Sequence, residues 1–64
     1  MKRGAFVRIN NKTVIKHLRG TEGIAVERMK NSNYIKVIQE YQGYITSLCY
    51  PENSLDMIEP PVEL

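Results

Sequence analysis

The sequence predicts an all-β fold, a small barrel of five strands, and three observations support this prediction. Short segments rich in β-branched residues and tyrosine are separated by short segments rich in Gly, Asn, Ser and Pro along the whole chain. The turn-forming segments recur roughly every 8–12 residues, a spacing typical of sandwiches and small barrels. Because 64 residues are too few for a sandwich of two full sheets, the barrel is the preferred architecture.

The first strand is expected over residues 4–9. Val7 and Ile9 would share one face of this strand, and Phe6 and Arg8 the opposite face. The asparagines that follow form turns readily, so the strand is expected to end there.

The segment over residues 13–19 is ambiguous. Its apolar residues Val14, Ile15 and Leu18 have the i, i+1, i+4 spacing of a short helical turn. Seven residues cannot form a helix on their own, because helix nucleation is costly. We expect an ordered loop, with one short helical turn, that folds back on the barrel and places Val14 or Leu18 in the core.

The second strand follows a tight turn. Residues 20–23 hold two glycines, which allow a positive φ or a close approach between strands. The strand is expected over residues 24–29, with Ile24, Val26 and Arg28 on one face.

A hairpin is expected next, with a loop over residues 30–33 and a β-branched return strand over 34–39. One helix over residues 26–41 is the rival interpretation. It would place the polar run 31–33 in the middle of the helix, where these side chains compete for backbone hydrogen bonds. The hairpin is therefore preferred.

The last third of the chain continues the alternation of strands and turns. A fourth strand is expected over residues 44–50, a turn over 51–54 and a closing strand over 55–59. Two prolines then end the fold, because neither can donate a hydrogen bond to a sheet. One domain is thus expected over residues 1–59, with a C-terminal tail over 60–64.

Charge is unevenly distributed along the chain. The net charge is only +2, yet all nine Lys and Arg residues precede residue 37 and five of the seven acidic residues follow it. Such an asymmetry indicates an electrostatic partner, although a barrel brings the two ends of a chain together.

The cysteine and histidine counts exclude several classes of site. Cys49 is the only cysteine, which excludes an internal disulfide and favours a reducing, cytoplasmic location. His17 is the only histidine, so no cluster with metal-ligand spacing exists. No apolar run approaches the roughly 18 residues that span a bilayer. We expect a soluble, unprocessed protein without metal, cofactor or membrane insertion.

Catalysis is not expected. Cys49 and His17 are the one conceivable nucleophile and base. A free cysteine within a strand is usually a small buried hydrophobic residue, and His17 is expected at the solvated surface of a loop. No pair of carboxylates has a spacing that suggests general acid–base catalysis.

Two glycine-led motifs in the first half of the chain carry a family resemblance: Gly4-x-x-Val7-x-Ile9 and Gly20-x-x-Gly23-x-x-Val26. Over about residues 3–38 the chain resembles KOW-type SH3-like barrels, which are modules of ribosomal proteins and transcription elongation factors. The segment between the two motifs is longer than a minimal KOW loop. The resemblance implies an SH3-like barrel that binds nucleic acid or associates with a ribosome or RNA polymerase.

A second resemblance implies the same fold with another role. Residues 3–9 are similar to the opening of the small stromal SH3-like subunit of photosystem I, and Tyr50–Leu55 to the closing turn of that family. That subunit is a peripheral docking protein without catalysis.

For a nucleic-acid partner, the candidate phosphate-binding residues are basic. Lys12, Lys16 and Arg19 belong to one long loop, and Lys30 lies on the hairpin that is expected to approach it. The alternative interpretation of these side chains is an ordinary solvated surface.

Tyrosines would supply stacking surfaces for bases. Tyr41 and Tyr44 bracket a turn and are the tyrosines most expected to be exposed. The alternative function is protein docking, for which we expect an exposed apolar or tyrosine-rich patch, or an unpaired edge strand near residues 45–49.

Overall fold

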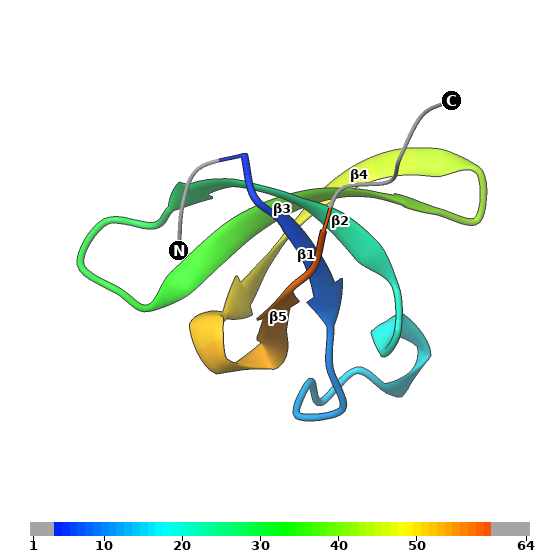
Figure 1. Ribbon diagram of the computed structural model, residues 1–64, viewed down its shortest axis with the longest axis horizontal. Helices are drawn as coiled ribbons and strands as arrows, with labels where there is room; N and C mark the ends of the chain where they lie inside the picture. Colours follow the sequence, from blue (N-terminus) through cyan, green and yellow to red (C-terminus); the bar gives the residue numbers. More distant parts are fainter. Residues whose placement is uncertain (1–3, 60–64) are drawn as a thin grey trace.

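The computed structural model describes residues 4–59 and has an all-β fold (Figure 1). Its strands are β1 (Phe6–Ile9), β2 (Glu22–Arg28), β3 (Tyr34–Tyr41), β4 (Tyr44–Pro51) and β5 (Leu55–Met57). They form one antiparallel sheet in the order β4-β3-β2-β1-β5. The prediction of five strands is confirmed, and the closing strand is shorter than expected.

Two short 3-10 turns are the helical elements of the described chain. They are η1 (Lys16–Leu18), in the loop between β1 and β2, and η2 (Glu52–Ser54), between β4 and β5. The predicted helical turn in the first long loop is therefore confirmed. The rival helix over residues 26–41 is wrong, because β2 and β3 pair across a hairpin there.

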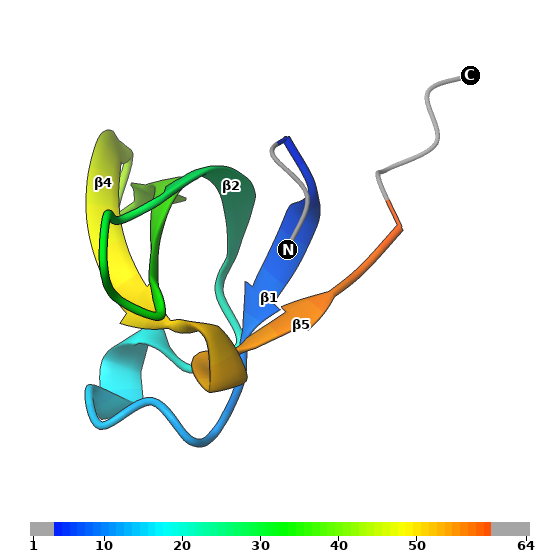
Figure 2. The same ribbon diagram turned by 90° about the vertical axis from the view of Figure 1, so that its left-hand side faces the viewer.

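The sheet is strongly bent, so that it curls around its own core (Figure 2). Its two edges are β4 and β5, and within residues 4–59 the curled sheet is open between them. The architecture is thus barrel-like without closure. The predicted tail over residues 60–64 lies outside the described residues.

The core lies on the concave face of the sheet. Val7 and Ile9 from β1 and Ile35 and Val37 from β3 are its largest fully buried side chains. These residues are buried together because side chains alternate between the two faces of a strand, so residues two positions apart share a face. The shared face predicted for Val7 and Ile9 is confirmed.

A β-bulge changes the face that β2 presents to the core. The pairing with β3 shifts between Ala25 and Glu27, and Ala25 is the buried residue of this strand. Ile24 lies on the outer face, where it is 38% exposed. The predicted face of Ile24, Val26 and Arg28 is therefore wrong, because an extra residue in a strand breaks strict alternation.

The two glycines predicted at a tight turn have different physical roles. Gly20 has a φ of +86°, which side chains with a Cβ rarely adopt. Gly23 lies within β2, where an added Cβ would come 2.6 Å from the Ile38 carbonyl oxygen and 2.7 Å from Val37 Cγ1. Both reasons foreseen for glycine, positive φ and close approach, apply, one at each position.

Candidate functional site

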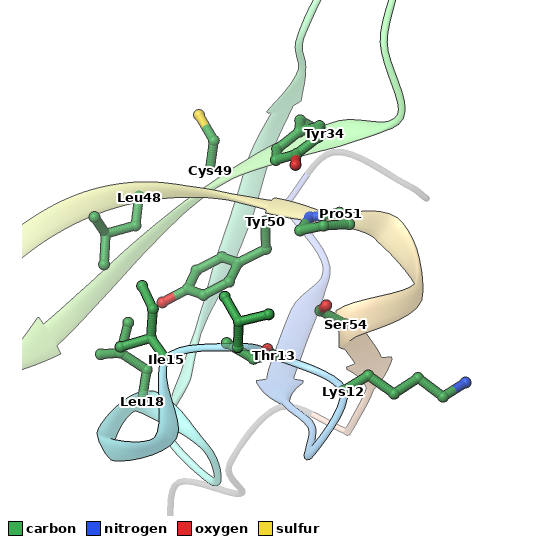
Figure 3. Close-up of a pocket in the computed structure, with 11 residues that line it drawn as sticks. Lys12, Thr13, Ile15, Leu18, Tyr34, Leu48, Cys49, Tyr50, Pro51 and Ser54 are labelled. Atoms are coloured by element: carbon green, nitrogen blue, oxygen red, sulfur yellow. The ribbon is translucent and has the colours of Figure 1, made fainter.

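A groove of about 220 Å³ lies between the long loop that joins β1 to β2 and the C-terminal end of β4. Figure 3 shows the Tyr50 ring extending from β4 toward this loop, from which Ile15 and Leu18 face it. Leu48 and Pro51 contribute to the β4 side. We call this hollow the loop groove.

The loop groove is lined by large apolar side chains that stay exposed. The exposed fractions are 88% for Val14, 43% for Ile15, 45% for Tyr34 and 38% for Leu48. Contiguous apolar surface of this kind marks sites of interaction on soluble proteins. This part of the molecule therefore has the character of a binding surface.

A directional chain of hydrogen bonds fixes the loop against the sheet. The Tyr50 hydroxyl donates to Gln39 Oε1, and Gln39 Nε2 donates to Thr21 Oγ1 at 2.9 Å. The Thr21 hydroxyl then donates to the Leu18 carbonyl oxygen at 2.6 Å. Both walls of the loop groove are thus connected through the buried Gln39 side chain, and the groove is preorganised.

Burial also affects the Tyr50 phenol. It raises the pKa of Tyr50 above the ordinary value of 10.0, and the hydrogen bond with Gln39 opposes this rise in part. The neutral phenol is therefore favoured, as a donor at the start of the hydrogen-bond chain requires.

Thr13 provides a polar group in the groove wall. Its side chain is only 5% exposed, and its Oγ1 atom has no hydrogen-bond partner within residues 4–59. The Thr13 carbonyl oxygen accepts a hydrogen bond of 2.8 Å from Arg19 Nε, which holds this part of the loop. Buried hydroxyls normally have a partner, so Thr13 Oγ1 is an unsatisfied polar atom beneath the surface of the groove wall.

Beside the groove, β4 is an edge strand with no partner on its outer side within residues 4–59, and it has no charged residue. It pairs with β3 through a two-residue turn in which Gln42 has a φ of 52° and Gly43 a φ of 84°. The residues that flank such a turn, Tyr41 and Tyr44, form a hydrogen-bonded pair. Hydrogen-bonded and non-bonded positions alternate along an antiparallel ladder.

This alternation determines which backbone groups of β4 face outward from the sheet edge. The N–H and C=O groups of Ile45, Ser47 and Cys49 point away from β3, toward the open edge. Charged residues usually protect a long edge from pairing with another chain, and β4 has none. The edge strand foreseen near residues 45–49 for a docking protein is therefore present.

Cys49 is exposed, which contradicts the prediction of a buried cysteine. Even-numbered residues of β4, such as Tyr50, face the core, so Cys49 faces outward opposite Lys36 (Figure 3). His17 is exposed, as expected, and its ring lies on the other face of the sheet, 5.5 Å from the Tyr41 ring. The structure does not bring the cysteine and the histidine together.

The contact between His17 and Tyr41 also brings four of the six predicted nucleic-acid-binding residues into one region. Lys16 and Arg19 lie on either side of His17 in the chain, and Tyr44 is paired with Tyr41 in the sheet. Tyr44 is 74% exposed, whereas Tyr41 is half-buried against the core.

The other two predicted residues lie elsewhere. Lys12 lines the loop groove. Lys30 is in the loop between β2 and β3, at the opposite end of β3 from Tyr41. Eight residues of strand place these ends roughly 23 Å apart. The six residues are thus divided between the two ends of the sheet.

Two arginines of the described chain are paired with acids. Arg8 forms an ion pair of 2.6 Å with Glu22, and Arg28 one of 2.7 Å with Glu52. The Arg28 guanidinium holds the pKa of Glu52 below its usual value. This pairing reduces the positive field that the charge pattern of the sequence predicts.

Two further types of site, a metal cluster and a membrane-spanning helix, are absent from the described residues. Residues 4–59 contain no group of three His, Cys, Asp or Glu side chains arranged to hold a metal ion. No helix in this part of the chain is long and apolar enough to cross a lipid bilayer.

Comparison of the chain with known protein families, with curated proteins and with solved structures found no match. The functional interpretation therefore depends on the geometry of the loop groove and β4.

Sequence reasoning did not find the loop groove. Its walls join Thr13 and Ile15 to Leu48 and Tyr50, residues more than thirty positions apart, and such contacts leave no local pattern. One signal was available: the run Tyr44–Pro51 is eight residues long and uncharged in a chain with 25% charged residues.

Proposed function

We propose that this chain is a non-catalytic docking module that binds another polypeptide through the loop groove and the adjacent edge of β4. The observation that carries the proposal is the juxtaposition of an exposed apolar groove with an uncharged, unpaired strand. Groove residues bind apolar side chains of an extended segment, while the free backbone groups of β4 pair with its main chain. Leu48 and Cys49 belong to both parts of this face.

An SH3-like barrel is the fold family that we propose for this module. The strand order, the long loop between β1 and β2, and the 3-10 turn between β4 and β5 support this assignment. A KOW-type relationship is the finer proposal, and it depends on the two glycine-led motifs.

Selection of a displayed random peptide library on the immobilised protein tests the docking function. Peptides should be enriched, and Leu48→Glu should weaken their binding at least about tenfold, because a charge would enter an apolar groove. Ile24→Glu is the matched control, since Ile24 and Leu48 are each 38% exposed and Ile24 lies on the outer face. Absence of enriched peptides, or equal loss in both variants, would exclude the proposal.

Nucleic-acid binding is a second candidate, favoured by the grouping of Lys16, Arg19 and the tyrosine pair at one end of the sheet. Lysine and arginine would contact phosphates while Tyr44 stacks on a base. Filter binding of mixed RNA and DNA at low salt tests this function. Lys16→Ala and Tyr44→Ala should each weaken binding, whereas the distant Lys30→Ala should not. No affinity at low salt would exclude direct binding.

A further inference from the structure

We infer that the occupant of the docking face is a second copy of this chain, paired antiparallel through β4 about a two-fold axis at Ser47. This inference rests on the proposed docking function, because it names the partner of that face. It predicts a symmetric dimer in which the two five-stranded sheets become one continuous sheet.

Pairing about Ser47 places compatible, uncharged residues of β4 opposite each other. Tyr44 would lie opposite Tyr50 of the second copy, Ile45 opposite Cys49, and Thr46 opposite Leu48. A two-fold interface requires each surface element to be complementary to itself, and in this register an aromatic residue faces an aromatic residue and uncharged side chains face uncharged side chains. No like charges oppose each other in this register, since the strand contains none.

The backbone groups that face outward from β4 are also arranged symmetrically about this axis. The outward-facing groups belong to Ile45, Ser47 and Cys49, and these residues are placed symmetrically about Ser47. Each would exchange two hydrogen bonds with its counterpart, giving about six between the chains. The ladder would stop at Pro51, which has no N–H group to donate.

Exposure and size also favour a second copy. Tyr44 and Ile45 are 74% and 72% exposed, and the pairing would cover both with apolar neighbours. A domain of 64 residues buries a small core, so added interface contributes to its stability.

The other sheet edge offers no equivalent partner. Pairing of β4 with β5 of another copy would involve only Leu55–Met57, which includes Asp56. It would also leave a free β4 and a free β5 at the ends, and would therefore produce open chains of molecules instead of a closed dimer.

A charge exchange at the axis tests the inference. In sedimentation equilibrium, the wild-type protein should change from monomer to dimer as its concentration rises. The dissociation constant should be on the order of micromolar, as expected for a small interface. Ser47→Lys alone and Ser47→Glu alone should each stay monomeric, because two like charges would meet at the axis. An equimolar mixture of the two folded variants should restore the dimer.

Each other outcome has a defined meaning. Dimerisation of either single variant as in the wild type, or a mixture that stays monomeric, would overturn the inference. A wild-type monomer at all concentrations that still binds selected peptides in a Leu48-dependent manner would overturn the inference and leave the docking function standing. A wild-type monomer that binds no peptide would overturn both.

The single cysteine reports the register. With Ser47 on the axis, the two Cys49 α-carbons lie about 14 Å apart. Spin labels on Cys49 should therefore give dipolar broadening in continuous-wave EPR, and dilution with unlabelled Cys49→Ser protein should remove it. Broadening that is unaffected by dilution, or none at dimer concentrations, would exclude this register.

Discussion

Among single residues, Gln39 connects the sheet with the long loop. Its side chain is 3% exposed, yet it connects Tyr50 on β4 with Thr21 at the end of the long loop. A glutamine in an apolar interior is stable there only because both ends of its amide have partners. This amide acts together with the backbone hydrogen bonds that join Ile9 to Gly20 and Thr21 in holding the long loop that shapes the loop groove.

Replacement of Gln39 by leucine should destabilise the protein by about 1–3 kcal/mol, because the Tyr50 hydroxyl and Thr21 Oγ1 lose their buried partner. Urea unfolding measures this change. Peptide binding should also weaken, since the side-chain connection between the loop and β4 is lost. An exposed amide, in Gln42→Leu, is the control and should change little. Unchanged stability in Gln39→Leu would show that the hydrogen-bond chain has no structural role.

Ionisation of Tyr50 makes the free energy of unfolding depend on pH in the alkaline range. Because its pKa is raised in the fold, the unfolded chain releases this proton first. The contribution of Tyr50 to stability is complete below about pH 10, the pKa of an unfolded tyrosine, and is lost as the pH rises toward the higher pKa of the fold.

Urea unfolding from pH 8 to pH 11 tests this linkage. The free energy of unfolding of the wild type should fall above about pH 10, and Tyr50→Phe should show a shallower fall because it has no phenol to ionise. Tyr44→Phe, at a 74% exposed position, should keep the wild-type profile. The same slope in the wild type and in Tyr50→Phe would contradict a raised pKa.

Among the elements, β2 shows where sequence reasoning succeeds and where it does not. Alternating apolar residues placed β1 and β3 correctly, because strict alternation continues through both strands. In β2 the bulge after Ala25 reverses the faces, and no residue type in the strand announces it. The prediction of a buried Cys49 was wrong for a related reason. The pairing of β4 with β3 determines whether the odd or the even residues of β4 face the core.

Gly23 is the position in β2 where the fold requires the absence of a side chain. Gly23→Ala should destabilise the protein by about 1–3 kcal/mol, because the new Cβ would overlap backbone and side-chain atoms of β3. Thermal unfolding measures the shift in midpoint. Gly20→Ala is the comparison: nothing lies within 4 Å of its Cβ position, so its cost is strain from positive φ alone, about 1 kcal/mol. Equal stability of Gly23→Ala and the wild type would contradict the close approach of β2 and β3.

For the whole molecule, the fold class was readable from the sequence and the site was not. Turn spacing and β-branched segments indicate a small five-stranded protein without any knowledge of contacts. The loop groove forms only when the bent sheet brings the long loop, residues 10–21, against the end of β4. The charge asymmetry pointed toward nucleic acid, but folding pairs Arg8 and Arg28 with acids and separates Lys30 from Lys16.

In the proposed docking function, this molecule acts through one face, formed by the loop groove and β4. Chemical-shift mapping of ¹⁵N-labelled protein with a selected peptide tests it most directly. The perturbed amides should belong to residues 12–18 and 45–50. Perturbations centred on the outer face, at Phe6, Ile24 and Ile38, would contradict it.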